Sequence, residues 1–175
     1  MEHTHIPEGT IIPPLRFATV EPYVYRGSYP RPLNFPFLES LELKVILSLT
    51  PEPLDEKLKQ WADSQGIRQI HIKPEKGQKK SAPLQPAQAK AVLEIALNQE
   101  NTPIYIHCLN GAGSSNKLMG CRYGRELIPV AEVTSLAICA LRKHQRWTHP
   151  TIFAEMLRFS EIRTSSEVFL FQGLE

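Results

Sequence analysis

The chain has 175 residues and a formal net charge of +2, and 42% of its residues are hydrophobic. A chain of this length can bury one substantial core but is short for two ordinary domains, so we expect a single domain. The small net charge excludes a broad basic surface of the kind that binds nucleic acid. Since neither a leader peptide nor an apolar run long enough to span a bilayer is present, we expect a soluble, cytoplasmic protein without membrane contact.

The three cysteines are an odd number, and their spacing matches no zinc template. Free thiols in a reducing compartment are therefore expected, with no metal and no cofactor.

The predicted elements alternate between strands and helices. Residues 1–16 carry three of the 15 prolines and no apolar period, which predicts a flexible N-terminal arm before a domain of residues 17–175. Strands are predicted at 20–25, 44–49, 67–72 and up to Cys108; helices are predicted at 35–41, 54–64, from Pro86 onward, 132–146 and 150–160. Asn34 is expected to cap the first helix. This alternation favours a single-domain α/β fold, a sheet covered by helices with its ligand site at the carboxyl ends of the strands.

One short motif carries chemistry: a strand from Pro103 leads into His107-Cys108 and then a glycine turn at Gly111. The motif resembles the nucleophile loop of cysteine-dependent phosphatases. In such a loop the thiolate attacks phosphorus, while backbone N–H groups and the following helix N-terminus hold the phosphate oxygens. An arginine six residues after the cysteine clamps two of those oxygens, but here the sixth residue is Ser114. The alternative is that Cys108 is only a small buried hydrophobic residue.

Several stretches together are similar to a known family, the tyrosine phosphatase-like proteins of fungal oxidant-induced cell-cycle arrest. They are residues 25–30, 34–41, 45–52, 103–111 and 141–147. The resemblance implies a cysteine-phosphatase fold of the atypical dual-specificity type in the cytoplasm. Active relatives are expected to hydrolyse phosphotyrosine-like or inositol pyrophosphate substrates, and some members are expected to lack the loop arginine.

The resemblance also implies roles for the loop residues of this chain. Cys108 takes the position of the nucleophile. The phosphate-binding residues are expected to be His107, Leu109, Asn110, Gly111 and Ala112.

The missing arginine permits two alignments. Read contiguously, Ser114 stands in its place; read with a gap, residues 113–131 are an insertion and Val133 stands there. We favour the gap, because 113–131 is rich in glycine without an amphipathic period, whereas 132–146 supplies the helix that must follow the loop. Loss of one such charged donor costs roughly 3–4 kcal/mol of transition-state stabilisation. Arg122 or Arg125 could substitute only if held rigidly in place.

A general acid is also not evident, because the two aspartates lie on the helix predicted at 54–64. Glu75 is the candidate acid in the loop after the 67–72 strand, although a glutamate exposed in a solvated loop is the commoner case. The same loop holds a lysine cluster, Lys73, Lys76, Lys79 and Lys80, which could attract a multiply phosphorylated ligand or simply be solvated.

Three functions remain open from the sequence. The first is an impaired or inactive phosphatase-like protein, a pseudophosphatase, that binds a phosphorylated protein, an inositol polyphosphate or a related phosphatase-like subunit. The second is an active cysteine-dependent protein tyrosine or inositol pyrophosphate phosphatase. The third is a redox-responsive protein that uses the Cys108 thiol for oxidation chemistry.

Overall fold

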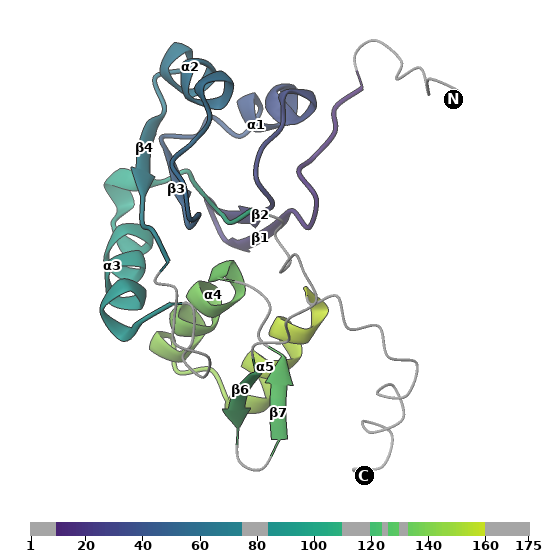
Figure 1. Cartoon of the computed structure of the whole chain (residues 1–175), viewed down its shortest axis with the longest axis vertical. Helices are drawn as coiled ribbons and strands as arrows, with labels where there is room; N and C mark the ends of the chain where they lie inside the picture. Colours follow the sequence, from purple (N-terminus) through teal and green to yellow (C-terminus); the bar gives the residue numbers. More distant parts are fainter. Residues whose placement is uncertain (1–9, 75–83, 110–119, 124–125, 130–132, 160–175) are drawn as a thin grey trace.

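The computed structural model describes residues 10–74, 84–109, 120–123, 126–129 and 133–159. Its centre is a five-stranded sheet of order β1-β2-β5-β3-β4 (Figure 1). The strands are β1 (Ala18–Glu21), β2 (Val24–Gly27), β3 (Val45–Ser48), β4 (Arg68–His71) and β5 (Ile104–His107). All of them run parallel except β1, which pairs antiparallel with β2. The predicted α/β fold with a helix-covered sheet is confirmed.

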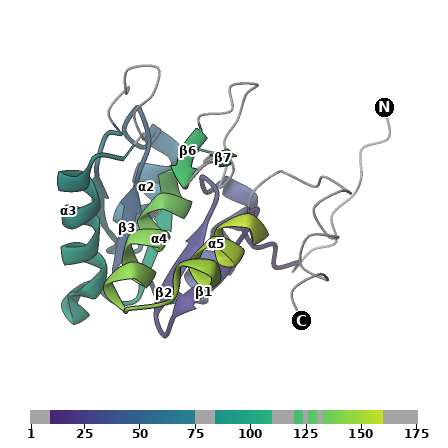
Figure 2. The same ribbon diagram turned by 90° about the horizontal axis from the view of Figure 1, so that it is seen from below.

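Helices cover both faces of the sheet (Figures 1 and 2). On one face lie α1 (Phe35–Glu39), preceded by the short helix η1 (Pro32–Asn34), and α2 (Glu56–Ser64). On the other lie α3 (Pro86–Leu97), which leads to η2 (Gln99–Asn101), and α4 (Val133–His144), against which α5 (His149–Arg158) packs. None of the helices in the described ranges combines the length and apolarity needed to cross a bilayer.

The central strand β5 divides its side chains between two cores, because successive residues of a strand point to opposite faces. Ile104, Ile106 and Cys108 belong to the core that includes α3 and α4. Tyr105 belongs to the core under α1 and α2. His107 lies on the Tyr105 side, with its ring stacked at 5.8 Å from that of Tyr105. The side chains of His107 and Cys108 therefore point to opposite faces of the sheet.

The predicted element bounds agree with the structure to within two residues, apart from two regions. The first predicted strand is in fact two strands, β1 and β2, joined by a turn in which Tyr23 has a φ of 66°. The second is a hairpin, β6 (Gly120–Tyr123) and β7 (Glu126–Pro129), inside the segment predicted as an insertion. The helix expected after the loop begins at Val133.

Asn34 occupies the predicted N-cap position of α1, but its side chain makes no capping bond to that helix. Its Nδ2 donates to the Ile12 carbonyl at 3.1 Å, and its Oδ1 accepts from the Arg31 N–H at 2.9 Å, a bond that belongs to the capping box of η1. A long-range bond to residue 12 is invisible to a rule that reads local spacing. A side-chain cap does form at α2, where Asp55 Oδ1 accepts the N–H of Leu58 at 2.8 Å.

The predicted arm and insertion lie partly outside the described residues. Within the described part of the arm, the Leu15 carbonyl accepts the Ser28 N–H at 2.9 Å. Flexibility of residues 1–16 stays a prediction, as does the insertion of 113–131.

Arg142 fastens the last two helices to the sheet edge. This buried residue donates from Nε to Glu155 of α5 at 2.8 Å, from Nη2 to the Val20 carbonyl at 2.8 Å, and from Nη1 to Glu21 of β1. Burial alone would lower the pKa of Arg142, but the hydrogen bonds and charges of Glu155 and Glu21 raise it. A buried guanidinium is tolerated where carboxylates and a carbonyl satisfy it in this way.

Gly27 is required by the packing of Tyr105 beneath the site. A Cβ at residue 27 would overlap Tyr105 Oη and lie 3.1 Å from its Cζ. We expect Gly27→Ala to lower the free energy of unfolding by roughly 1–3 kcal/mol, the usual cost of overpacking. Adding Tyr105→Phe removes the overlapping oxygen, so the double variant should lose less stability than the sum of the single variants. Urea unfolding of the four proteins measures this, and strict additivity would contradict the explanation.

Candidate active site

Cys108 lies at the carboxyl end of the middle strand of the sheet and is 6% exposed. Both neighbouring strands hold its flanks: the Leu49 N–H after β3 donates to the His107 carbonyl at 2.8 Å, and the Tyr29 N–H after β2 donates to the Leu109 carbonyl at 3.3 Å. The backbone before and after the thiol is thus bonded to two different loops. α/β proteins bind their ligands at these carboxyl ends of the strands.

His107 orients this strand end from the opposite face. Its Nε2 lies 2.8 Å from Ser48 Oγ, and its Nδ1 lies 3.3 Å from the Cys108 carbonyl. Because the carbonyl can only accept, Nδ1 carries the proton in the neutral ring, and Nε2 accepts the Ser48 hydroxyl hydrogen. The imidazole therefore links β3 to the backbone of Cys108 itself.

Burial keeps His107 neutral. The ring is inaccessible to solvent, and this desolvation lowers its pKa from 6.5 to about 4. A hydrogen bond to the Cys108 backbone raises the pKa and the charge of His71 lowers it, but neither outweighs burial. His107 thus serves as a neutral hydrogen-bonding group, and it contributes no positive charge toward a phosphate.

Tyr29 connects the site to α2. Its ring packs edge-on against His107 with centroids 5.3 Å apart, and its hydroxyl accepts the Asp55 N–H at 2.8 Å. Burial is the main cause of a raised pKa for Tyr29. The Asp55 carboxylate is engaged as the α2 cap, so this aspartate is committed to the helix.

The residue that takes the arginine position in the gapped alignment packs into the core. Val133 begins α4 and lies against the core formed by α3, α4 and the sheet. An aliphatic side chain there contributes no charge and no hydrogen-bond donor to a phosphate.

A guanidinium does contact the first turn of α4, but it comes from β2. Arg26 is 1% exposed, and its Nη2 donates to Ser135 Oγ at 2.9 Å while the guanidinium lies 4.0 Å from the Phe159 ring centroid. Sequence reasoning missed Arg26. The signal in the sequence was an arginine next to the apolar run that ends at Tyr25. The structure pairs Arg26 in register with Ile106 of β5.

Several predicted site residues lie outside the described residues. They are Glu75, Asn110, Gly111 and Ala112, together with Ser114 and the lysines at 76, 79 and 80. Leu109 is described and is 50% exposed beside Cys108. Lys73 Nζ lies 3.9 Å from Glu52 Oε1, and both side chains are largely exposed, so this ion pair contributes little to the stability of the fold. In the described part of the chain, no group of three His, Cys, Asp or Glu side chains could hold a metal ion.

Comparison with known proteins shows the family to which this chain belongs. The model of the tyrosine phosphatase family matches residues 11–125. The chain belongs to this family. It is 34% identical to OCA6 of Saccharomyces cerevisiae over 86% of the chain and 65% of that protein. It is 33% identical to the probable tyrosine-protein phosphatase DG1060 of Dictyostelium discoideum, over 91% and 86%, and 32% identical to inositol diphosphatase DSP4 of Arabidopsis thaliana, over 91% and 72%.

Solved structures agree with the assignment to the tyrosine phosphatase family. The core catalytic domain of the PP-IP phosphatase SIW14 from S. cerevisiae, in complex with citrate, superimposes with a TM-score of 0.72 at 31% identity, covering 90% of this chain and 84% of that one. TpbA of P. aeruginosa shares the fold, with a TM-score of 0.60 at 17% identity, covering 92% and 86%. The resemblance to the fungal oxidant-induced arrest proteins and the cysteine-phosphatase fold are both confirmed.

The low pKa of His107 predicts a pH-dependent stability. Between about pH 4 and 6.5 the unfolded chain binds a proton at His107 that the folded chain does not, so the free energy of unfolding rises with pH across this window. The contribution of this one group is on the order of 3 kcal/mol.

His107→Gln should therefore flatten the increase in stability between pH 4.5 and 7, as measured by urea unfolding at each pH. His144→Gln, at an exposed position on α4, is the matched control. An unchanged increase in the His107 variant would show that the buried imidazole is not the source.

Proposed function

We propose that this protein is a tyrosine phosphatase-like protein that binds phosphate groups at the Cys108 loop and turns them over slowly or not at all. The observation that carries the proposal is the combination of a preserved strand end at Cys108 with a partly buried, aliphatic Val133 that packs against the core at the start of α4. The first supports a cradle for an anion at the end of β5. The second supports the loss of the charge that stabilises the transition state.

The energetic consequence falls on catalysis more than on binding. Backbone N–H groups of a loop and the N-terminus of the helix after it can hold phosphate without any side-chain charge. The arginine acts more strongly on the transition state, where one electrostatic donor is worth roughly 100- to 1,000-fold in rate. A chain that keeps the loop and lacks the arginine is expected to retain affinity while losing turnover.

The relatives indicate two ligand classes. Several of them are named inositol diphosphatases, among them DSP4 of A. thaliana and SIW14 of S. cerevisiae, which supports an inositol polyphosphate. Others, such as DG1060 of D. discoideum, are named tyrosine-protein phosphatases, which supports a phosphorylated protein. A related phosphatase-like subunit is the proposed partner. A cytoplasmic location is part of the same proposal.

A second candidate function is an active inositol pyrophosphate phosphatase. The observation that favours it is the 31% identity with the SIW14 catalytic core across 90% of this chain. It requires a cation from outside the loop, and Arg122 on β6 is a candidate because the hairpin joins the loop to α4. It also requires an acid, for which Glu75 is the candidate.

We expect little or no turnover from the purified chain. Release of phosphate from para-nitrophenyl phosphate and from a 5-diphosphoinositol pentakisphosphate should lie at least 100-fold below that of the SIW14 catalytic core assayed in parallel. Cys108→Ser measures the background that does not depend on the thiol. Robust release that disappears in Cys108→Ser would overturn the proposal and favour the active enzyme, and Arg122→Gln and Glu75→Gln would then test its cation and its acid.

A second prediction concerns restoration of the clamp. Deleting residues 113–131 removes the β6–β7 hairpin, whose two strands pair with each other and with no other described strand, and makes residue 133 the sixth after Cys108. The deletion should fold. Adding Val133→Arg should then create stabilisation by orthovanadate in thermal unfolding, which neither the parent nor the simple deletion shows to the same extent.

Val133→Lys in the same deletion is the matched control, because it adds charge without a two-pronged donor. A deletion variant that fails to fold would show that 113–131 belongs to the core. A folded arginine variant without added vanadate stabilisation would show that the Cys108 loop is not a phosphatase cradle.

A further inference from the structure

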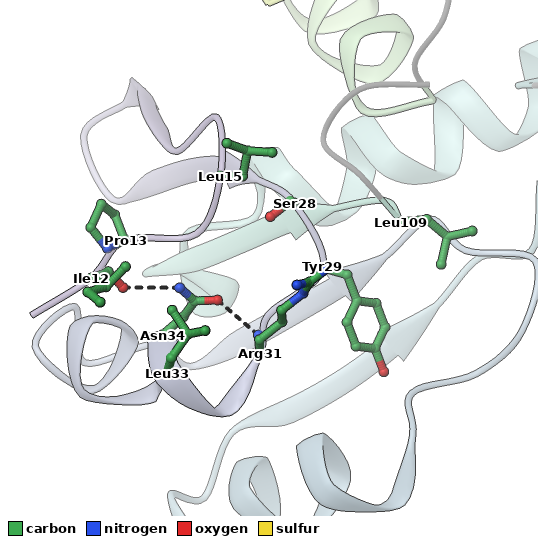
Figure 3. Close-up of a pocket in the computed structure, with 9 residues that line it drawn as sticks. All are labelled: Ile12, Pro13, Leu15, Ser28, Tyr29, Arg31, Leu33, Asn34 and Leu109. Carbon is green, nitrogen blue, oxygen red and sulfur yellow. Dashed lines mark hydrogen bonds between the residues drawn. The ribbon is translucent and has the colours of Figure 1, made fainter. Parts of the chain in front are cut away.

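A pocket of about 390 Å³ opens beside Leu109, the residue after Cys108 (Figure 3). Its apolar lining comes from three separate parts of the chain: Ile12, Pro13 and Leu15 from the N-terminal segment, Leu33 from η1, and Leu109 from the residue after Cys108. Leu15, Leu33 and Leu109 are 67%, 46% and 50% exposed. Among the described residues, three of the seven large hydrophobic side chains exposed to solvent therefore gather at one pocket.

The wall of this pocket is held in place by specific hydrogen bonds. The buried side chain of Asn34 donates to the Ile12 carbonyl at 3.1 Å and accepts from the Arg31 N–H at 2.9 Å, so it ties the N-terminal segment to η1 (Figure 3). The Ser28 N–H holds the Leu15 carbonyl at 2.9 Å. A buried amide with partners in both segments fixes the position of one segment relative to the other.

The pocket reaches the described residues next to Cys108. Tyr29 lines it and also packs on His107, and its N–H binds the carbonyl of Leu109. A ligand whose phosphate lies over the Cys108 loop could therefore place a neighbouring group against Leu109 and Leu33.

The chemistry of the lining favours a peptide over an inositol polyphosphate. Arg31 is the one lysine or arginine among the nine lining residues, and its side chain is directed toward Tyr29 (Figure 3). Every substituent of an inositol polyphosphate is a phosphate or a hydroxyl, so such a ligand has nothing to bury against leucines. A peptide with a leucine-like side chain next to acidic groups matches both the apolar walls and the guanidinium.

We propose that the Leu15–Leu33–Leu109 pocket binds an apolar side chain of an acidic protein ligand, whose phosphorylated residue lies over the Cys108 loop and whose carboxylates face Arg31. The proposal rests on phosphate binding at that loop. It selects a phosphorylated protein from the ligand classes left open above.

Fluorescence polarisation with a set of phosphotyrosine peptides tests the proposal. The reference peptide carries phosphotyrosine among alanines and one glutamate, and six further peptides place a leucine at one of the three positions on either side. We expect leucine at one position to tighten binding at least fivefold. Leu33→Asn should abolish this gain and leave the affinity for the reference peptide unchanged.

Leu97→Asn is the matched control, because Leu97 is also 46% exposed but lies at the end of α3, away from the pocket. It should keep the gain in full. A gain that survives Leu33→Asn, or no gain at any position, would overturn the proposal. So would loss of inositol hexakisphosphate binding in Leu33→Asn without any effect of the peptide leucine, which would assign the pocket to inositol polyphosphates.

A probe without phosphate separates failure of this proposal from failure of the proposed function. N-acetyl-leucine carries the apolar side chain and one carboxylate, and N-acetyl-leucinamide lacks the charge. In methyl NMR spectra we expect N-acetyl-leucine to shift Leu15, Leu33 and Leu109 but not Leu97, and to do so at lower concentration than the amide in wild type but not in Arg31→Gln. If no phosphopeptide binds, these shifts still decide the pocket: their presence supports it, and their absence overturns it.

Discussion

The parallel pairing of β5 with strands on both sides is the constraint on which the site depends. Pairing with β2 and β3 at once fixes the position of the last residue of β5 relative to its neighbours. Backbone hydrogen bonds from Tyr29 and Leu49 extend this pairing to the residues that follow the strand. Cys108 is thereby placed at the carboxyl end of the middle strand, with its flanking backbone already hydrogen-bonded. A loop that must hold a phosphate by its own N–H groups needs such support, because a displaced amide loses most of its interaction energy.

Polar groups buried around β5 make this arrangement specific. Ser48 binds His107 and Tyr105 binds the Ser28 carbonyl, while Arg26 reaches Ser135 on the opposite face. Burial raises the pKa of Tyr105 well above 10, so its hydroxyl remains a donor. An unpaired group in the interior costs more than a paired one contributes, so each pair penalises a shift of its strand or helix. The fold keeps the framework of a phosphatase in a chain whose loop has no arginine at the expected position.

This framework separates positioning from electrostatics. The neutral His107 and the bonded backbone orient the start of the loop at Cys108 and Leu109, whereas the positive charge of a phosphatase loop normally comes from its arginine. With Val133 packed against the core, the anion binding that we propose would depend on backbone dipoles, which stabilise a bound phosphate better than a transition state. Recognition can then come from beside the loop, where Leu33, Leu109 and Arg31 surround a pocket built by the N-terminal segment.

The sequence by itself determined the order of the elements, the α/β class and the position of Cys108 at a strand end, because apolar period and turn chemistry are local properties of the chain. It also indicated that no arginine stands six residues after Cys108. Tertiary structure alone decided the split of the first strand, the use of Asn34 to hold Ile12, the burial of Arg26 against Ser135, and the pocket beside Leu109. The last three of these join residues far apart in sequence, and such contacts arise from packing between elements, which no local pattern records. The split of the first strand is local, but its turn needs Tyr23 at a φ of 66°, which a tyrosine does not indicate.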